Sequence, residues 1–443
     1  MSQSSDRWLY AWSAGYAAVG AASILVPLYA ISLGAGPFVV GLIAATGAFA
    51  GVPSALLWGR LATKTGRYRP FVLLSLGASA LAFGVLPLVE NVWYVVLANA
   101  LLIFASAAAA PVLTLLVVSG VPEAGWDGRI GFLNQQQGYG WLIGLLAGAG
   151  WSALVGGRLV DAQTAQQWFF FLSAGTTGVA TVLAWRWLPG RPDVTMARFG
   201  RSTETVERLI RGSGRAFRIT PFAGLRSFWA IRRLDPRAFA KRLSPELAAY
   251  LAAVFFAFTG FAVFFGPITV FLTGPLSIGS DGVFVLFLVS SALSAVGYGW
   301  AGRLSATRGP HRVQLGALGV RVVLFPAVGF VTLLALDPFA VLLPVFALVG
   351  LTWAFVAVTA TTIVTRLAPP AIRGDALGAY SALGGVATGV GSLLGGWLAG
   401  SVSYRAAFGV AGGLVLVGGA LALAEYRESG GHATDAEMGE NSV

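Results

Sequence analysis

The 443-residue chain contains no cysteine, and only 11% of its residues are charged. The missing cysteines exclude disulfide bonds and thiol chemistry. Soluble globular proteins carry roughly 25% charged residues, so the low charge content excludes an ordinary soluble domain. Uncharged runs of about 20 residues, long enough for a membrane-spanning helix, alternate with short charged links. Residues 1–6 lack the basic region and cleavage site of a signal peptide, so we expect the first apolar run to be retained.

Patterns for catalysis are also missing. The sequence has no Walker-type phosphate loop, no cluster of metal ligands and no nucleophile paired with a base. We therefore expect no catalytic residue, no metal and no cofactor, and neither an enzyme nor an ATP-driven pump.

Acidic side chains avoid the middle of every apolar run. All 18 Asp and Glu residues fall in links, tails or run ends, and both histidines, His311 and His432, fall in links or tails. Proton-coupled carriers commonly use a carboxylate or imidazole inside the membrane. Two hypotheses stay open: transport without such a relay, or coupling through groups at helix ends such as Asp375 or Glu425.

The apolar runs predict an all-α polytopic membrane protein with twelve transmembrane helices. The six expected in the first half are Trp8–Leu33, Phe38–Leu57, Pro70–Leu88, Val92–Ser119, Ile130–Val155 and Trp168–Leu188. The six expected in the second half are Leu247–Thr273, Val283–Ala301, Val313–Leu334, Phe339–Val364, Ala376–Gly400 and Ala406–Ala424.

Basic residues cluster in the links on one side of the membrane. Residues 59–69 hold four cations between two apolar runs, and residues 302–312 repeat the pattern. Because short cytoplasmic loops are enriched in Lys and Arg, these links indicate the cytoplasmic side. That placement puts 26 of the 29 cations inside the cell and both termini in the cytoplasm. Arginine far outnumbers lysine, which is typical of a GC-rich prokaryote and therefore of a cell membrane.

A repeat divides the chain into two halves. A shift of 247 residues places Gly131, Gly138, Gly144 and Gly148 on Gly378, Gly385, Gly391 and Gly395. Two six-helix bundles in the same orientation follow, as parallel repeats. The expected units are a first bundle at 1–188, a basic cytoplasmic connector at 189–246, a second bundle at 247–424 and a disordered tail at 425–443. The connector mixes arginines with aromatic residues, which favours anionic lipid headgroups as its partner over nucleic acid.

The first basic link, Gly59-x-Leu61-Ala62-x-x-x-Gly66-Arg67-x-Arg69, resembles the signature loop of the major facilitator superfamily. The resemblance implies two bundles that rock around a site near the middle of the membrane. It also implies a cytoplasmic gating loop and its weaker copy, formed by Gly59, Arg60, Gly66, Arg67, Arg69, Gly302, Arg303 and Gly309. The sequence departs from the family at Thr63 and Asn99, where the family usually has an acid and an arginine, and it lacks the Gly-Pro element of drug/proton antiporters.

Polar residues on the helices that line the cavity in this family are the candidates for substrate binding. Amides, hydroxyls and aromatic rings can orient an uncharged ligand in an apolar pocket. Four consecutive amides at 134–137 point in all directions, so at least one must face protein or water. Ser and Thr are weaker candidates because they often bond to their own helix. The candidates are Tyr16, Asn99, Asn134, Gln135, Gln136, Gln137, Trp141, Thr259, Ser294, Tyr298, Thr359 and Tyr380.

Arg321 is the one charge predicted within a span. It either binds a substrate anion, or it reaches the membrane surface or the carbonyls of a neighbouring helix. Six phenylalanines between 255 and 265 could stack on an aromatic substrate, although packing and lipid contact explain them more simply.

The sequence favours a secondary transporter of a small neutral or amphipathic molecule that works by alternating access as a monomer, with efflux preferred over uptake. Two alternatives stay open: uptake of an organic anion through Arg321, and a membrane sensor or scaffold that does not transport.

Overall fold

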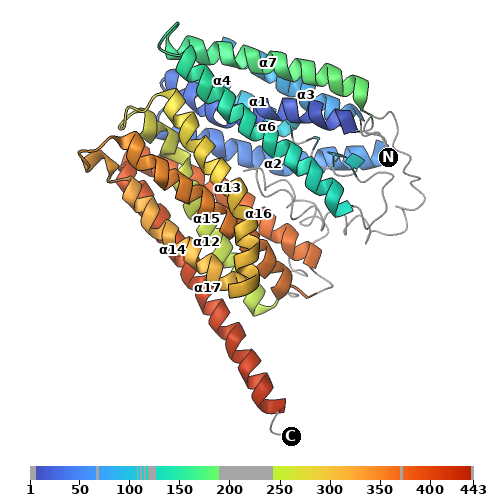
Figure 1. Cartoon of the computed structure of the whole chain (residues 1–443), viewed down its shortest axis with the longest axis vertical. Coiled ribbons are helices and arrows are strands. Elements are labelled where there is room, and N and C mark those ends of the chain that lie inside the picture. The colour runs from blue at the N-terminus through green and yellow to red at the C-terminus, as the bar shows by residue number, and fades with distance from the viewer. Residues whose placement is uncertain are drawn as a thin grey trace.

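The computed structural model describes residues 6–65, 69–106, 108–109, 112–113, 116–117, 126–188, 243–369 and 373–440. These residues form α-helices with short turns and no strand, as predicted (Figure 1). The helices of the first half are α1 (Arg7–Ser32), α2 (Pro37–Thr65), α3 (Arg69–Val85), α4 (Val92–Ser106), α6 (Trp126–Leu154) and α7 (Ala162–Trp187). Those of the second half are α12 (Pro245–Thr273), α13 (Ser280–Arg308), α14 (Pro310–Val328), α15 (Pro338–Leu367), α16 (Arg373–Ser401) and α17 (Tyr404–Glu440).

Within the described ranges, eight helices are long and apolar enough to cross a bilayer, and two apolar helices, Pro37–Gly51 and Val92–Ser106, are shorter. The second of these covers the start of the fourth predicted span, whose remaining residues are described only in fragments. Residues 189–242, which hold most of the predicted basic connector, lie outside the described part of the chain.

Several helices begin at capping residues that the sequence supplies. Ser244 accepts a hydrogen bond from the Leu247 amide at 3.2 Å, and Pro245 occupies the first helical position of α12, as predicted from the Ser-Pro-Glu sequence. Asp161 accepts from the Thr164 amide at 2.9 Å at the start of α7, and this hydrogen bond lowers the pKa of the Asp161 carboxyl.

Two predicted boundaries differ from the structure. The second basic link is mostly helical: α13 continues to Arg308, and Gly309 alone, with φ at +83°, makes the turn into α14. Glycine adopts this left-handed backbone without steric cost. The tail, which we expected to be disordered from residue 425, instead continues α17 to Glu440, because Glu425 packs against α14 and no proline follows to stop the helix (Figure 1).

The predicted gating loop is described only in part. Gly59, Arg60, Gly66 and Arg67 fall among residues whose side chains are not described. Arg69 is described, and its guanidinium donates to the Trp185 carbonyl, which joins the start of α3 to the end of α7. The second copy, with Gly302 and Arg303, lies on the last turns of α13.

The two halves pack in the same way, as the repeat predicts. In the first half α6 lies on α1, where a Cβ at Gly144 would overlap the Ala17 carbonyl. In the second half α16 lies on α12, where a Cβ at Gly391 would overlap the Thr259 carbonyl. Glycines that correspond in the repeat therefore allow one close helix crossing in each bundle.

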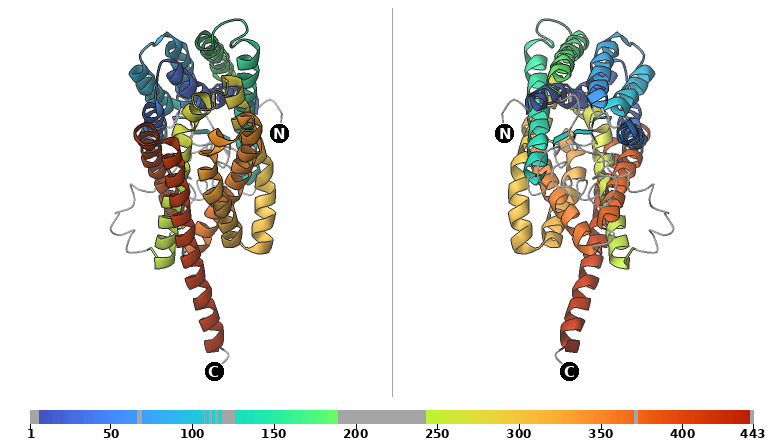
Figure 2. Two further views of the ribbon diagram at one scale, coloured as in Figure 1. Left: turned by 90° about the vertical axis from the view of Figure 1, so that its left-hand side faces the viewer. Right: turned by 90° about the vertical axis from the view of Figure 1, so that its right-hand side faces the viewer.

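The two bundles meet mainly at one face of the molecule. We call this the far face, where α1, α6, α12 and α16 end; the connector face is the opposite one, where α7 ends and α12 begins. Figures 1 and 2 show one bundle above the other, and in Figure 1 their axes diverge towards the connector face. The contacts that join the bundles lie in the far-face half.

One of these contacts joins the start of α2 to the end of α16 through backbone atoms. A Cβ at Gly41 would overlap the Ser392 carbonyl, and a Cβ at Gly396 would lie 2.6 Å from the Pro37 carbonyl. A second contact joins the other two helices: a Cβ at Gly148 of α6 would overlap the Phe284 ring of α13. We call these glycine contacts the far-face seam.

We predict that Gly41→Val opens the far-face seam. Overpacking costs about 1–3 kcal/mol, which corresponds to about a fivefold to 150-fold change in the equilibrium between closed and open seam. Because the chain has no cysteine, the reporter is Ser392→Cys, a position 3% exposed. Its labelling by a water-soluble maleimide should accelerate in the Gly41→Val background. Gly400→Ala is the control, since a Cβ there has its nearest contact at 3.9 Å; equal labelling in both backgrounds would contradict the prediction.

Candidate functional site

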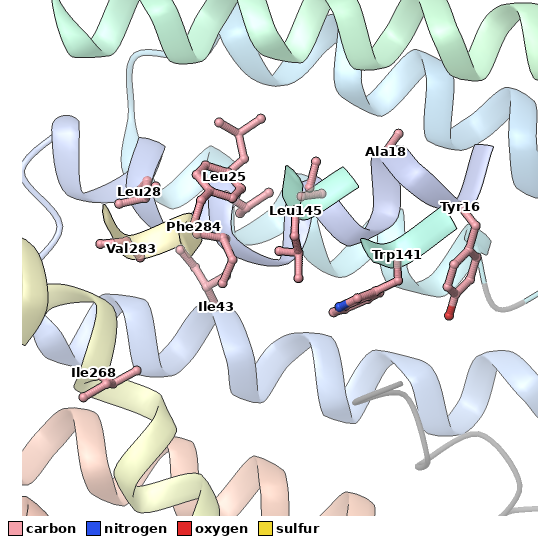
Figure 3. Packing of buried hydrophobic residues seen from close by; sticks show 14 of the residues in the cluster. Tyr16, Ala18, Leu25, Leu28, Ile43, Trp141, Leu145, Ile268, Val283 and Phe284 are labelled. Carbon is pink, nitrogen blue, oxygen red and sulfur yellow. The ribbon is translucent and has the colours of Figure 1, made fainter. Parts of the chain in front are cut away.

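An aromatic cluster lines the inner part of the first bundle. Trp12 and Tyr16 lie one turn apart on α1, and Tyr16 meets Trp141 of α6 (Figure 3). The ring centroids are 6.0 Å and 6.3 Å apart, respectively. The Trp12 indole nitrogen is buried and has no hydrogen-bond partner in the described part of the chain. A buried indole N–H usually has a partner, so this donor is available to a ligand.

The four amides next to this cluster face different ways. Gln135 is exposed, and its amide nitrogen donates to the Tyr139 hydroxyl at 2.8 Å on the outer surface of the bundle. Asn134, Gln136 and Gln137 are buried. The Gln137 side chain makes no hydrogen bond within the described residues. The Gln136 side chain also makes no hydrogen bond among the described residues, but it lines the cavity between α1, α6 and α7. Gln137 is therefore the member of the quartet best suited to a ligand between the bundles, and Gln135 is the least suited.

A second aromatic cluster occupies the equivalent part of the other bundle. Phe258 of α12 lies 6.0 Å from Trp353 of α15 and 5.9 Å from Tyr380 of α16, measured between ring centroids. Phe258 and Trp353 are both half-buried, whereas Tyr380 is buried. Further along α12, Phe264 is fully buried and stacks on Phe325 of α14 at 4.2 Å. Of the six phenylalanines between 255 and 265, Phe261 and Phe264 are therefore core residues, and the half-buried Phe258 shares a cluster with Tyr380.

Arg321 lies behind this second cluster and is fully buried. Its Nε donates to the Thr352 hydroxyl at 2.9 Å, and its Nη2 donates to the Val349 carbonyl at 2.7 Å. The guanidinium carbon lies 4.2 Å from the centre of the Phe261 ring and 5.9 Å from that of Trp353. Desolvated cation–π contacts are worth about 2 kcal/mol. Arg321 therefore joins α12, α14 and α15. This matches the expectation that it bonds a carbonyl of a neighbouring helix, and its full burial excludes the expectation that it reaches the membrane surface.

The remaining candidates make mostly structural contacts. Asn99 donates to the Ile43 carbonyl of α2 at 3.1 Å. Thr259 and Thr359 each donate to the carbonyl four residues earlier in their own helix, at 2.7 Å. Ser294 differs, because its hydroxyl is buried and has no partner among the described residues. Tyr298 is half-buried one turn further along α13.

A cavity of about 620 Å³ lies elsewhere, between α1, α6 and α7. Its walls include Ser13, Gln136 and Thr176, and its rim includes the exposed side chains of Tyr10 and Tyr139. This cavity lies within one bundle and opens on its outer surface. A site that alternates between two sides must lie between parts that move, so we place the candidate substrate site at the aromatic clusters instead.

One ion pair at the connector face was not predicted from the sequence. Arg129 at the start of α6 donates to both carboxylate oxygens of Asp6, at 2.6 Å and 2.5 Å, and to the Val117 carbonyl at 3.3 Å. The hydrogen bonds from Arg129 lower the pKa of the Asp6 carboxyl and raise that of the guanidinium. The pair therefore holds the start of α1 against the start of α6.

A comparison with known families decides the identity of the chain. The model of the Major Facilitator Superfamily matches residues 8–387 and 323–440. The chain belongs to the major facilitator superfamily. It therefore has the fold of a multi-pass membrane transporter, and its family indicates a transporter.

Solved structures of other superfamily members show the same fold. The nucleoside transporter NupG is 13% identical with a TM-score of 0.66, over 96% of this chain and 99% of that one. The xylose transporter XylE from E. coli, in a partially occluded inward-open conformation, is 13% identical with a TM-score of 0.64, over 95% and 97%. A bacterial homologue of the human lysosomal transporter Spinster is 14% identical with a TM-score of 0.62, over 95% and 96%. No curated protein sequence matches the chain.

We predict that Arg321→Met leaves the fold intact, within about 1 kcal/mol, because replacing a buried charge by an apolar side chain of similar size is often neutral. The Thr352 hydroxyl keeps its bond to the Leu348 carbonyl at 2.8 Å. Arg321→Ala should instead destabilise by about 2–5 kcal/mol through the cavity it leaves. Thermal unfolding in detergent measures both variants, with Arg405→Ala on the far face as a control. Equal loss in the Met and Ala variants would mean that the charge itself is required.

We predict that Asp6→Asn lowers stability at neutral pH and not in acid. The folded-state pKa of Asp6 is lowered, so its contribution is present above the unfolded pKa and is lost as the pH falls through the folded pKa. The pair is half-buried and in contact with water, which limits the effect to about 1 kcal/mol. Thermal unfolding of both proteins between about pH 7 and about pH 3 should give curves that converge in acid; a constant difference across this range would show that the ion pair contributes nothing.

Proposed function

We propose that this superfamily member is a secondary transporter that moves a small, uncharged or amphipathic organic molecule with a ring system, by alternating access between its two bundles. The substrate would lie between Trp12, Tyr16 and Trp141 of one bundle and Phe258 and Tyr380 of the other. The rings would stack on the apolar part of the substrate, and the Gln137 amide would bond to its polar groups.

One observation carries this proposal. Uncharged polar side chains that make no hydrogen bond among the described residues lie on the same helices as the two aromatic clusters or next to them. The Trp12 N–H, the Ser294 hydroxyl and the Gln137 amide make no hydrogen bond among the described residues. Such groups discriminate strongly in favour of substrates that bond to them, because leaving them unpaired is costly. Arg321 also has one buried nitrogen, Nη1, without a hydrogen-bond partner among the described residues. Its other contacts, to Thr352, Val349 and the Phe261 ring, hold the guanidinium behind the second aromatic cluster, so we favour an uncharged substrate over an anion.

We further propose that the protein is a monomer in the cell membrane with both termini in the cytoplasm. Among the described arginines, Arg158 and Arg405 lie near the far face, whereas most of the others lie near the connector face. Such an excess of cations indicates the cytoplasmic side. The basic connector would then lie against anionic lipid headgroups. Export is the favoured direction, since a neutral aromatic site suits amphipathic compounds that enter cells through lipid.

The proposal is tested first by a thermal-shift screen of neutral, cationic and anionic ring compounds. A ligand at 100 times its Kd raises stability by about 2.7 kcal/mol, which is readily measured. We predict that neutral or cationic amphiphiles stabilise the protein, and that Gln137→Leu lowers the affinity of the best of them about tenfold, the loss expected for one hydrogen bond with an unpaired partner.

Gln135→Leu is the matched control, with the same substitution two positions away on the exposed surface of α6. It should leave affinity unchanged. Stabilisation by anions alone, or equal losses in the two variants, would contradict the proposed site. Uptake of the radiolabelled compound into proteoliposomes then tests transport itself; binding without flux would contradict the transporter.

A further inference from the structure

The cavity of about 620 Å³ between α1, α6 and α7 takes no part in the proposed transport site. In Figure 3 the Tyr16 and Trp141 rings point away from α7, the green helix, so the cavity lies on the other side of the contact between α1 and α6. The two backbones pack tightly at that contact, since a Cβ at Gly140 would overlap the Ser13 carbonyl. Small-molecule sites typically measure about 300–1,000 Å³, so this second cavity is large enough for a ligand of its own.

Small side chains on α1 create this space. Beyond Tyr10 at the rim, the α1 wall is made of residues no larger than serine, which are Ser13, Ala14, Ala17, Ala18 and Ala21. The lining residues of α6 run from Gln136 to Ala147, which is about 16 Å along a helix. The cavity is therefore elongated along the helices and has one wall of alanines, against which a flat ring can pack.

The opening of the cavity faces the lipid. Its rim includes the exposed side chains of Tyr10, Tyr139 and Leu172 on the outer surface of the bundle. Tyr139 lies ten residues beyond Arg129, which is at the connector face, and so about 15 Å along the helix from it. Because the hydrocarbon core of a bilayer is about 30 Å thick, this opening lies at the depth of the lipid chains. A ligand would thus enter from the bilayer and not from water.

Two polar side chains of the cavity wall make no hydrogen bond. Gln136 of α6 is 8% exposed and Ser173 of α7 is 5% exposed, and both line the cavity. The Ser13 hydroxyl donates to the backbone carbonyl of Gln136 at 2.8 Å, and the Gln136 side-chain amide makes no hydrogen bond among the described residues. The Ser173 hydroxyl makes none there either. Unpaired amides and hydroxyls are costly in an apolar environment, so these two groups favour an occupant that bonds to them.

We propose that this cavity binds an uncharged, lipid-soluble ring compound that carries a hydroxyl group. No charged side chain is among the described residues that line the cavity, so a neutral ligand fits it best. A hydroxyl both donates and accepts, and can therefore donate to the Gln136 amide oxygen and accept from the Ser173 hydroxyl. The ring would lie between the alanines of α1 and the Phe169 ring, which also lines the cavity. Such a compound is either a polycyclic membrane alcohol or a smaller phenol dissolved in the membrane.

Photoaffinity labelling in nanodiscs tests the site. The probe is para-decylphenol with a photoactivatable diazirine in its alkyl chain, and mass spectrometry locates the labelled residues. We predict labelling of the cavity walls on α1, α6 and α7. Unmodified para-decylphenol, cholesterol or both should compete, whereas decylbenzene, which lacks the hydroxyl, should need an at least about tenfold higher concentration. Competition by cholesterol would indicate a membrane alcohol as the ligand, and competition by para-decylphenol alone would indicate a smaller phenol.

Two variants test the polar contacts, and one neighbouring variant is the control. Gln136→Leu and Ser173→Ala should each raise the probe concentration for half-maximal labelling about tenfold, the loss expected for one hydrogen bond with an unpaired partner. Gln137→Leu carries the same substitution one position away and should leave this labelling unchanged. Thermal unfolding without probe shows that each variant is folded, and using two variants protects the test against one that is not.

Three results would overturn the proposal. They are equal competition by decylbenzene, unchanged labelling in both Gln136→Leu and Ser173→Ala, and labelling of the exposed face of α3 as strong as that of the cavity. The proposed transport function fails separately. A ligand between the bundles depends on Gln137, whereas a ligand in this cavity depends on Gln136, and labelling here requires no flux.

Discussion

Close approach of helix backbones is the constraint on which the rest of the structure depends. Lipid chains are as apolar as the helices themselves, so helix association depends on van der Waals contact, and that contact is best where side chains are absent. A Cβ at Gly350 would overlap the Ser290 carbonyl, where α15 lies on α13. The same holds for α6 on α1 and for α16 on α12. The glycines at these crossings are therefore packing residues, although glycine otherwise lowers helix stability.

Because few residues of the chain are charged, the few charged groups that are buried distinguish the interior of one bundle from that of the other. Arg321 has no carboxylate partner among the described residues and depends on two hydrogen bonds and three aromatic rings. The buried Glu425 carboxylate lies 3.1 Å from the His311 imidazole. Both lie in the second bundle, and the first bundle offers amides and indole N–H groups instead. The two halves are built from one repeat, yet among the described residues the second bundle holds the buried charged groups and the first holds uncharged polar groups.

The sequence predicted what depends on local composition. The spans, the repeat and the packing glycines follow from hydrophobicity and spacing, and the cap at Ser244 follows from three adjacent residues. Contacts between distant residues could not be predicted. Asp6 and Arg129 are 123 positions apart, and His311 and Glu425 are 114 apart. No local signal pairs such residues, and the expectation of a disordered tail further separated Glu425 from the core.

The amide quartet shows a different limit of sequence reasoning. Four consecutive residues cover all sides of a helix, so the sequence required that one face the protein but could not say which. The answer depends on the rotation of α6 about its axis, and that rotation is fixed by the contact of Gly144 with Ala17 of α1. The rotation turns Gln135 outward to Tyr139 and buries Gln137. Packing far along the helix thus selects the polar group that is available to a ligand.

The glycine contacts fall into two classes, and the difference bears on how the molecule moves. Gly144 and Gly391 correspond in the repeat and join helices within one bundle. Gly41 and Gly396 join the two bundles at the far face. Rocking of rigid bundles breaks contacts of the second class and keeps those of the first. On the α2–α16 side the seam is built from backbone contacts of Gly41 and Gly396, whereas on the α6–α13 side the Phe284 ring packs on Gly148. Glycine has no side chain to interlock on either side, so the two surfaces can separate while each bundle moves as a unit.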